Sequence, residues 1–183
     1  MNCPVCQSEK FGPAELDAGL HAFRCESCAG NWVRGGSYWE WLRVHGDNLP
    51  ERREPTAGEA AQEDRRAKLC PDCHTPMFRY TVGHGLGFGL DQCPACKGIW
   101  LDAAEWEALR KRNLHDDIHA VFTAPWQAEV SREERRRRLE QIYLKRFGAE
   151  DYEEVTRVRE WLDASARKQE LLAYLTDPNP WSV

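Results

Sequence analysis

The chain reads Cys93-Pro94-Ala95-Cys96-Lys97-Gly98-Ile99-Trp100 near its middle. A second stretch, Cys25-Glu26-Ser27-Cys28-Ala29-Gly30-Asn31-Trp32, has the same Cys-x-x-Cys pair, the same glycine and the same tryptophan. Each stretch follows another Cys-x-x-Cys pair, at Cys70/Cys73 and at Cys3/Cys6, across 19 and 18 intervening residues. Because the two copies agree at cysteines, turn residues and aromatic residues, the sequence indicates a duplicated unit.

The eight cysteines of the chain all fall in these four pairs. Four thiolates from two Cys-x-x-Cys pairs form the closed tetrahedral S4 site that is typical of structural zinc. The predicted ligands are Cys3, Cys6, Cys25 and Cys28 for one zinc ion and Cys70, Cys73, Cys93 and Cys96 for a second, giving two Zn2+ per chain. A unit of about 45 residues buries too little apolar surface to fold without the metal.

Other uses of these side chains stay open. Iron can take the same S4 geometry. Disulfides and a thioredoxin-like redox pair are less favoured, because the chain starts at Met1-Asn2-Cys3 with no expected secretory leader and no βαβ pattern surrounds the pairs. His115 and His119 have the spacing of one helix face, but a surface or capping role is favoured over a metal role because both four-cysteine sets are complete.

A helix is predicted after the second cysteine pair of each copy. Residues 102–105 and 37–40 both have the pattern of a capping box, and Gly46 is expected to end the helix that Ser37 opens. Knuckle, hairpin, knuckle and helix follow one another as in a zinc ribbon. We therefore expect Trp32 and Trp100, which follow the second knuckles, to cover the thiolates.

The second copy, from Cys-Pro-x-Cys at residues 70–73 to the stretch 91–105, resembles the bacterial zinc-ribbon family named after the transcription-factor-IIB zinc finger. The first copy departs from that pattern, because Glu26 replaces a knuckle proline and Val33-Arg34 stands where Leu-Asp is expected. The resemblance covers residues 1–48 and 70–113 and implies a small metal-bound α+β fold. It does not by itself indicate a function, since one fold serves many.

The charge and composition of the chain argue against two further classes of function. The 183 residues include 30 acidic and 25 basic side chains, for a formal net charge of −5. Two S4 zinc sites, each with a net charge of −2, bring the folded chain to about −9. This balance argues against binding nucleic acid without regard to sequence, and the short apolar stretches argue against a membrane span. We therefore predict a cytoplasmic protein that binds another protein.

Some aromatic and apolar side chains are candidates for contact with a partner. Trp39 and Trp41 stand two residues apart on a predicted helix, so they cannot share one face and one of them is expected to be exposed. The glycine-rich stretch 83–89 lacks the Gly-Lys-Ser/Thr ending of a phosphate loop and is predicted to be a flexible hairpin tip that exposes Leu86 and Phe88.

The last third of the chain is predicted to be an α-helical hairpin. A capping box at residues 131–134 opens a helix that Gly148 closes, and a second helix runs from Asp151, through or restarting at Ser165, to Asp177. Its single apolar seam is expected to dock on a ribbon, on a second copy of the chain in a homodimer, or on a partner. The basic run is Arg135, Arg136, Arg137 and Arg138. Flanking glutamates favour an ion-paired face over contact with nucleic acid or an acidic partner.

The predicted organisation is zinc ribbon 1 at 1–48, a linker at 49–69 with a helical turn around 58–68, zinc ribbon 2 at 70–119 and the helical segment at 120–183. No nucleophile with a base is evident, and a closed S4 site has no open position for a substrate water, so an enzyme is not expected. The favoured function is a protein-binding adaptor or regulator. Nucleic-acid binding, in a transcription-associated role, is the first alternative, and redox or metal handling is the second.

Overall fold

The computed structural model describes residues 1–46, 50–52 and 66–181. Its strands are β1 (Phe11–Asp17), β2 (Leu20–Cys25), β3 (Asn31–Val33), β4 (Phe78–Gly83), β5 (Leu86–Gln92) and β6 (Ile99–Leu101). Its helices are α1 (Gly35–His45), α2 (Glu105–Lys111), α3 (Ile118–Val121), α4 (Ala124–Phe147), α5 (Ala149–Ala164) and α6 (Lys168–Thr176). The helical turn predicted around residues 58–68 lies mostly outside the described residues.

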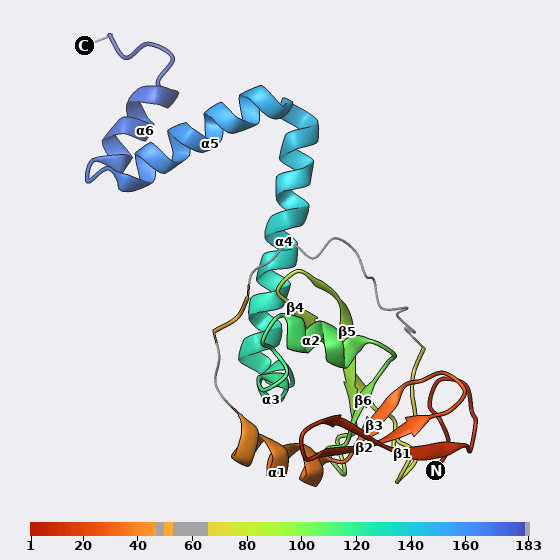
Figure 1. Cartoon of the computed structure of the whole chain (residues 1–183). Coiled ribbons are helices and arrows are strands. Elements are labelled where there is room, and N and C mark those ends of the chain that lie inside the picture. Colours follow the sequence, from red (N-terminus) through yellow and green to blue (C-terminus); the bar gives the residue numbers. More distant parts are fainter. Residues whose placement is uncertain (47–49, 53–65, 182–183) are drawn as a thin grey trace. The chain divides into compact units, whose positions relative to one another are not determined.

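One antiparallel sheet runs through both ribbons, with the strand order β1-β2-β3-β6-β5-β4. The two halves meet at β3 and β6, which Figure 1 labels. In this pairing Trp32 lies opposite Trp100 and Asn31 lies opposite Leu101. Counted outward from this seam, the strands are β3, β2 and β1 in one half and β6, β5 and β4 in the other, as expected for a duplicated unit. The predicted α+β fold of tandem zinc ribbons followed by helices is confirmed, and the two ribbons prove to share one sheet.

The two faces of this sheet carry different cores, because successive side chains of a strand point to opposite faces. Trp32 and Trp100 lie on the face that packs against the cysteines. Val33, Ile99 and Leu101 belong to the other core, which α1, α2 and α3 cover. The buried helical side chains of that core are Tyr38, Trp41, Trp106, Leu109, Ile118 and Val121. The helices of both ribbons therefore contribute to a single apolar core.

Helix α1 begins two residues before the predicted cap. Its first residue is Gly35, with Arg34 at the N-cap position, so the capping box expected at Ser37 is wrong. A Cβ atom on Gly35 would lie 2.8 Å from the carbonyl oxygen of Lys97, which shows that α1 starts directly against the second ribbon. That close approach determines where the helix begins. The predicted end of the helix at Gly46 is confirmed.

Helix α2 has half of its predicted capping box. The backbone N–H of Asp102 donates to Oε2 of Glu105 at 2.7 Å. The Asp102 side chain does not return the bond, because its Oδ1 accepts from the Trp100 indole at 2.6 Å. The helix therefore begins at Glu105, and Ala104 precedes it with a positive φ of 69°.

The glycine-rich stretch 83–89 is mostly strand and not a flexible tip. β4 ends at Gly83 and β5 begins at Leu86, so the turn consists of His84 and Gly85. Phe88 is 3% exposed and lies in the core beneath α2 and α3, and Leu86 is half-buried against the same core. The interpretation of Phe88 as exposed was wrong because alternation along β5 turns this side chain to the helix-covered face.

Helix α4 is continuous from Ala124, so the capping box predicted at Ser131 is wrong. Pro125 lies in the first helical turn, where its missing N–H removes no helical hydrogen bond. The predicted break at Gly148 is confirmed, because α4 ends at Phe147 and Gly148 has a φ of 83°. α5 ends at Ala164 and α6 begins at Lys168, so of the two predicted alternatives the helix restarts near Ser165 and does not continue through it.

The chain divides into two compact units, residues 1–131 and 132–183. The first turns of α4 belong to the ribbon unit, since the Trp126 indole donates to the carbonyl of Val82 at 2.9 Å and Gln127 bonds the backbone of Thr81. The domain boundaries given above remain a prediction. Within the described residues, no helix combines the length and the apolar character that crossing a bilayer requires.

Candidate metal centres

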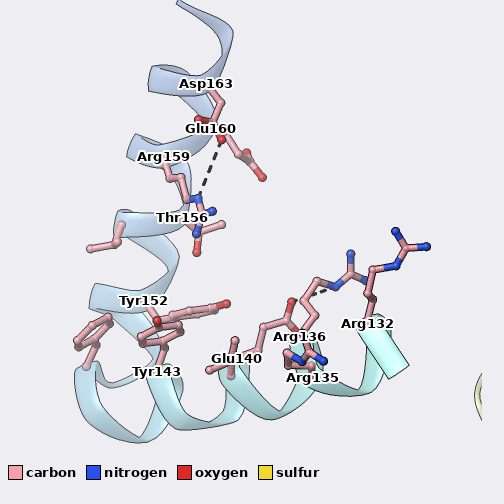
Figure 2. Close-up of a pocket in the computed structure, with 13 residues that line it drawn as sticks. Arg132, Arg135, Arg136, Glu140, Tyr143, Tyr152, Thr156, Arg159, Glu160 and Asp163 are labelled. Atoms are coloured by element: carbon pink, nitrogen blue, oxygen red, sulfur yellow. Dashed lines mark ion pairs between the residues drawn. The ribbon is translucent and has the colours of Figure 1, made fainter. Parts of the chain in front are cut away.

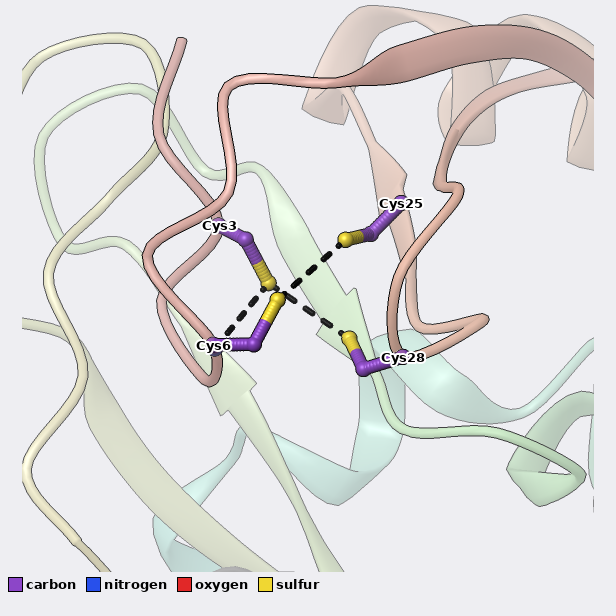
Figure 3. A group of neighbouring side chains, drawn as sticks. All are labelled: Cys3, Cys6, Cys25 and Cys28. Atoms are coloured by element: carbon purple, nitrogen blue, oxygen red, sulfur yellow. Dashed lines mark hydrogen bonds between the residues drawn. The ribbon is translucent and has the colours of Figure 1, made fainter.

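The first metal centre lies between the β1–β2 hairpin and the seam of the sheet. Cys3 and Cys6 come from the N-terminal knuckle, and Cys25 and Cys28 come from the knuckle that follows β2 (Figure 3). The Sγ atoms of Cys3 and Cys28 are 3.5 Å apart, as are those of Cys6 and Cys25. All four sulfurs lie within 4.8 Å of one another.

The second centre repeats this arrangement. The Sγ atoms of Cys70 and Cys96 are 3.6 Å apart, and those of Cys73 and Cys93 are 3.5 Å apart. In each centre one cysteine from each pair is fully or almost fully buried, namely Cys3 and Cys25 in the first and Cys70 and Cys93 in the second. The other cysteine of each pair lies nearer the surface.

The sulfur geometry fits zinc. A tetrahedral ion with Zn–S bonds of about 2.3 Å places its sulfurs about 3.8 Å apart, close to the observed separations. A disulfide needs about 2.05 Å, and all eight cysteines are free thiols, so the disulfide alternative does not apply. The two four-cysteine groups fit two zinc ions per chain, which is the predicted cofactor. When bound, each ion joins two knuckles that are distant in sequence.

The surroundings of the thiols are suited to thiolate ligands. The backbone N–H of Cys6 points to Sγ of Cys3 at 3.5 Å, and the N–H of Cys73 points to Sγ of Cys70 at 3.4 Å. Burial opposes ionisation of Cys25, but hydrogen bonds from the backbone of Cys28 and Ser27 outweigh it and lower the pKa of Cys25 to about 7. Such knuckle N–H groups stabilise the charged sulfur that binds a metal.

Burial has the opposite effect on the innermost thiols. It raises the pKa of Cys3 and of Cys70 well above the usual range. The hydroxyl and backbone of Thr75, by contrast, lower the pKa of the exposed Cys73 to about 6. Each centre therefore combines a buried thiol with a raised pKa and a thiol with a lowered pKa. Zinc binding displaces the protons that remain.

Each tryptophan at the seam covers the knuckle of the other ribbon. A Cβ on Gly98 of ribbon 2 would lie 2.2 Å from the Trp32 ring, and a Cβ on Gly30 of ribbon 1 would lie 2.2 Å from the Trp100 ring. Both rings are completely buried. The expectation that these tryptophans lie against the metal centres is confirmed. Each ring, however, packs against the knuckle glycine of the other copy. Only glycine leaves room for the facing ring, so the repeated glycine was the sequence signal for this contact.

Polar contacts also cross between the ribbons. The Trp32 indole donates to Oδ2 of Asp72, in the first knuckle of ribbon 2, at 3.1 Å. The Arg34 side chain pairs with the same carboxylate at 2.9 Å. Arg34 stands where the family pattern has aspartate, and Asp72 had no assigned role in the sequence. The departure of the first copy from the pattern thus supplies a contact to the second.

A buried charge cluster lies beside the second centre. The Lys68 ammonium, whose side chain is fully buried, pairs with Asp91 at 2.7 Å and with Asp102 at 3.2 Å. Arg79 pairs with Asp91 at 3.0 Å. Burial and the neighbouring Asp102 charge raise the pKa of Glu105 to about 8. No sequence pattern indicated this cluster, because its members are spread over residues 68–105.

The structure places the candidate partner-binding residues differently. Trp39 is 54% exposed and its ring lies 5.4 Å from that of His119. Trp41 is buried and contacts Trp106 at 5.6 Å between ring centroids, so it is not available to a partner. The helical spacing had indicated that one of the two would be exposed. Leu86 and Phe88 belong to the ribbon core as described above.

The four arginines of the basic run lie on α4 and are exposed. Arg136 pairs with Glu140 at 3.6 Å and Arg137 with Glu133 at 3.8 Å, both across one helical turn. Part of the run is therefore ion-paired, as the flanking glutamates predicted. Arg135 and Arg136 also line a groove between α4 and α5.

The structure shows the contacts of the two helically spaced histidines, His115 and His119. His115 packs between the rings of Trp41 and Trp106, and Nδ1 of His119 lies 3.0 Å from the carbonyl of Asp116. Among the described side chains, the two four-cysteine groups are the arrangements that could hold a metal ion. Both histidines serve packing and local hydrogen bonding.

Comparison with known families agrees with this geometry. Residues 2–44 and 69–112 each match the family described as a transcription factor zinc-finger. The two matched segments are consistent with two tandem zinc-ribbon copies. The matched segments each contain one complete four-cysteine set, one three-strand half of the sheet and the helix that follows it. No curated protein and no solved structure matches the chain.

Proposed function

We propose that this double zinc ribbon is a non-catalytic adaptor that recognises another protein through its ribbon and helical surfaces. The observation that carries the proposal is Trp39, a large aromatic side chain that is 54% exposed on a zinc-held scaffold. Exposed tryptophans on rigid elements often supply much of the binding energy of an interface. Val44 on the same helix is also exposed, to 61%.

The metal centres support a scaffold and not a catalyst. Four thiolates complete the coordination of each zinc ion and provide no position for a reacting water. The thiols of this chain also need a reducing compartment to stay free for the metal, which is consistent with the cytoplasm. The role assigned to zinc is to hold the knuckles and, through them, the surface of α1.

The proposal is tested by capture from the native host with the wild-type chain and two variants. Trp39→Ala removes the exposed ring, and Arg43→Ala changes another exposed residue of the same helix as a matched control. The expected result is a protein that copurifies with wild type and with Arg43→Ala and is depleted at least about tenfold with Trp39→Ala. Equal recovery with all three proteins would contradict a role for this surface.

Nucleic-acid binding is a second candidate, which the exposed basic run on α4 favours. Arginines that contact phosphates release counterions, so binding falls steeply with salt. If this function is correct, a DNA or RNA duplex binds at low salt, and Arg135→Gln combined with Arg138→Gln reduces the salt slope. Absence of binding at 50 mM salt, about where such contacts are strongest, would rule it out.

A further inference from the structure

The C-terminal unit leaves most of its apolar surface uncovered. Among its described residues, 132–181, Leu162 is the only buried side chain. The large apolar side chains that are more than a third exposed are Leu139, Ile142, Tyr143, Phe147, Val155, Val158, Trp161, Tyr174, Leu175 and Trp181. Helices of this length are held in place by burial of an apolar face rather than by intrinsic propensity. The unit therefore requires a covering surface.

Four of these side chains, Leu139, Tyr143, Phe147 and Val155, line a groove of about 680 Å³ between α4 and α5. Its floor consists of Leu139, Tyr143 and Phe147 from α4 and Tyr152 and Val155 from α5. The three α4 residues are spaced by four, so they form one stripe, and the rings of Tyr143 and Phe147 stack at 5.6 Å. The floor is thus a continuous surface beside Gly148, where α4 and α5 meet.

The two helices that form the groove have opposite charge. From Arg132 to Phe147, α4 has seven basic and three acidic side chains, for a net charge of +4. α5 has six acidic and two basic side chains, for a net charge of −4. The charged side chains that line the groove are Arg132, Arg135, Arg136 and Glu140 on the α4 side and Arg159, Glu160 and Asp163 on the α5 side, so each side keeps the sign of its helix (Figure 2).

These charges do not neutralise each other within the described chain. The ion pairs of this region stay on one helix, as between Arg136 and Glu140, or join α5 to Lys168 through Asp163. Among the described residues, no ion pair links α4 to α5. A covering surface that fits the groove must therefore bring acidic side chains to α4, basic side chains to α5 and apolar side chains to the floor.

We propose that this surface is the same groove of a second copy of the chain. In a two-fold symmetric dimer, α4 of each copy lies against α5 of the other, because contacts in such an interface occur in reciprocal pairs. The +4 helix then meets the −4 helix twice, and the two apolar floors cover each other. One chain supplies both halves of the required complementarity, whereas an acidic peptide or nucleic acid would neutralise α4 alone.

This dimer does not depend on the proposed adaptor function. It uses the α4–α5 groove, whereas the adaptor proposal uses Trp39 on α1, which belongs to the other compact unit. If the chain dimerises but captures no partner through Trp39, the dimer stands and the adaptor function is wrong. If it captures such a partner but stays monomeric, the adaptor function stands and the dimer is wrong.

The test uses the full-length, zinc-loaded chain in analytical ultracentrifugation over a range of concentrations. The wild type is expected to be a dimer. Replacing Tyr143 and Phe147 by alanine removes the centre of the floor and is expected to give a monomer. Circular dichroism and a zinc content of two per chain verify that each variant is folded. A wild type that stays monomeric at high micromolar concentration overturns the proposal.

Charge reversal identifies which helices face each other. Arg135→Glu with Arg136→Glu makes α4 repel α5 of the second copy, and Glu160→Arg with Asp163→Arg has the reciprocal effect. Each variant alone is expected to raise the dimer dissociation constant by at least about tenfold. Mixing the two variants restores both sets of contacts, so heterodimers should form in preference to either homodimer.

The matched control is Arg137→Glu with Arg138→Glu, which makes the same charge change on the same helix outside the groove. This variant should dimerise like the wild type. A control that weakens the dimer as much as the groove variant, or a mixture that fails to form heterodimers, would show that the helices do not pair in this way. Binding of a different protein to a monomeric chain at the groove would also overturn the dimer.

Discussion

Ribbon 1 and ribbon 2 present the same four thiols, but the residues beside them are different. Ribbon 2 has a buried cluster of charges around Lys68, whereas ribbon 1 has mostly aromatic and apolar residues at the corresponding positions. At an offset of 67 residues for the first knuckle and 68 for the second, Lys68, Asp91 and Asp102 correspond to Met1, Phe23 and Arg34. The first copy has one extra residue before its helix, so Glu105 corresponds to Tyr38. The metal centres and the seam were retained while the environment around them changed.

This difference indicates which features hold a ribbon together. Thiols, knuckle glycines and seam tryptophans are present in both copies and contact one another across the seam. The charge cluster is present in one copy, so a ribbon of this kind folds without it. Buried ion pairs often contribute little net stability because their desolvation offsets their attraction. Substitutions in matched positions of the two copies can separate these contributions.

The largest effect is expected from loss of a metal ligand. Cys25→Ser and Cys93→Ser should each lose the zinc ion of their own ribbon and with it binding free energy on the order of 10 kcal/mol. Because β3 and β6 join the copies, each variant should also release the other zinc ion to a chelator faster than wild type. Zinc content and release rate measure this, with Ser27→Ala as the control. Unchanged release from the intact site would mean that the ribbons fold independently.

In the C-terminal unit, the same variants should leave the helical signal of α5 and α6 in place. These helices contain no zinc ligand and lie in the other compact unit. Circular dichroism of Cys93→Ser tests this point.

Replacing either seam tryptophan by alanine is expected to lower the free energy of unfolding by about 3–5 kcal/mol, the usual range for a buried aromatic residue. The change in zinc release is expected in the other ribbon. Trp32→Ala removes the ring that covers Gly98, so it should speed zinc release from ribbon 2, and Trp100→Ala should do so from ribbon 1. Site-resolved cysteine accessibility distinguishes the two centres. Trp39→Ala, at an exposed position, should change neither. An effect confined to the mutated ribbon would contradict the exchanged packing.

Replacing one basic residue in each ribbon by methionine compares the buried charge cluster of ribbon 2 with the more exposed ion pair of ribbon 1. Lys68→Met leaves Asp91 and Asp102 buried without their shared cation, and the free energy of unfolding should fall by about 3 kcal/mol. Arg34→Met breaks an ion pair whose arginine side chain is 54% exposed, and the loss should stay within about 1 kcal/mol. Chemical denaturation of the zinc-loaded protein measures both. Equal losses would mean that burial does not distinguish the two ribbons.

The smallest effect is a pH dependence in ribbon 2 alone. Burial and the Asp102 charge raise the pKa of Glu105 from 4.5 to about 8, so its ionised form is penalised in the folded state. The penalty is absent below pH 4.5, grows as the pH rises through that interval and is complete above pH 8. Glu105→Gln should therefore raise stability at pH 9 by about 2 kcal/mol, because one pKa unit corresponds to about 1.4 kcal/mol and the buried amide offsets part of the gain.

From pH 6 to pH 9 the stability of Glu105→Gln should rise relative to that of the wild type, because the zinc-bound thiolates add the same pH dependence to both proteins and Glu105 adds a penalty to the wild type alone. Tyr38→Phe is the matched control in ribbon 1. It loses the hydrogen bond from the Tyr38 hydroxyl to the carbonyl of Asp116 but introduces no titration in this range. Parallel profiles for wild type and Glu105→Gln would contradict the assignment.

The parts of the fold that depend on local sequence were predicted correctly. Cysteine pairs at fixed spacing identified the metal centres, because a tetrahedral ion tolerates few arrangements of ligands. Gly148 marked a helix end because its φ of 83° favours glycine, and Gly46 marked another, where a Cβ would lie 2.6 Å from the carbonyl oxygen of Leu42. Capping boxes were less reliable. The patterns at Ser37 and Ser131 fall inside α1 and α4, whose actual starts follow from packing against the ribbons.

Contacts between the copies were beyond the reach of the sequence. The spacing of the cysteines is the same whether the ribbons are separate or share a sheet, so it did not indicate the β3–β6 pairing. The repeated glycines Gly30 and Gly98 were a signal of close packing, but the sequence did not show that each faces the tryptophan of the other copy. Exposure of Phe88 was mispredicted for the same reason, because glycines on both sides resemble a loop while the covering helices come from later in the chain.

The sequence alone determined that this protein has two four-thiol metal centres, two ribbons and a helical C-terminal part, because ligand chemistry and helix periodicity act over short stretches of chain. The tertiary structure decided that the ribbons share one sheet, that each covers the knuckle of the other, and that Lys68 pairs with distant carboxylates. Those outcomes depend on surfaces brought together from residues far apart in the chain, where the burial of apolar side chains and the pairing of buried charges select one arrangement.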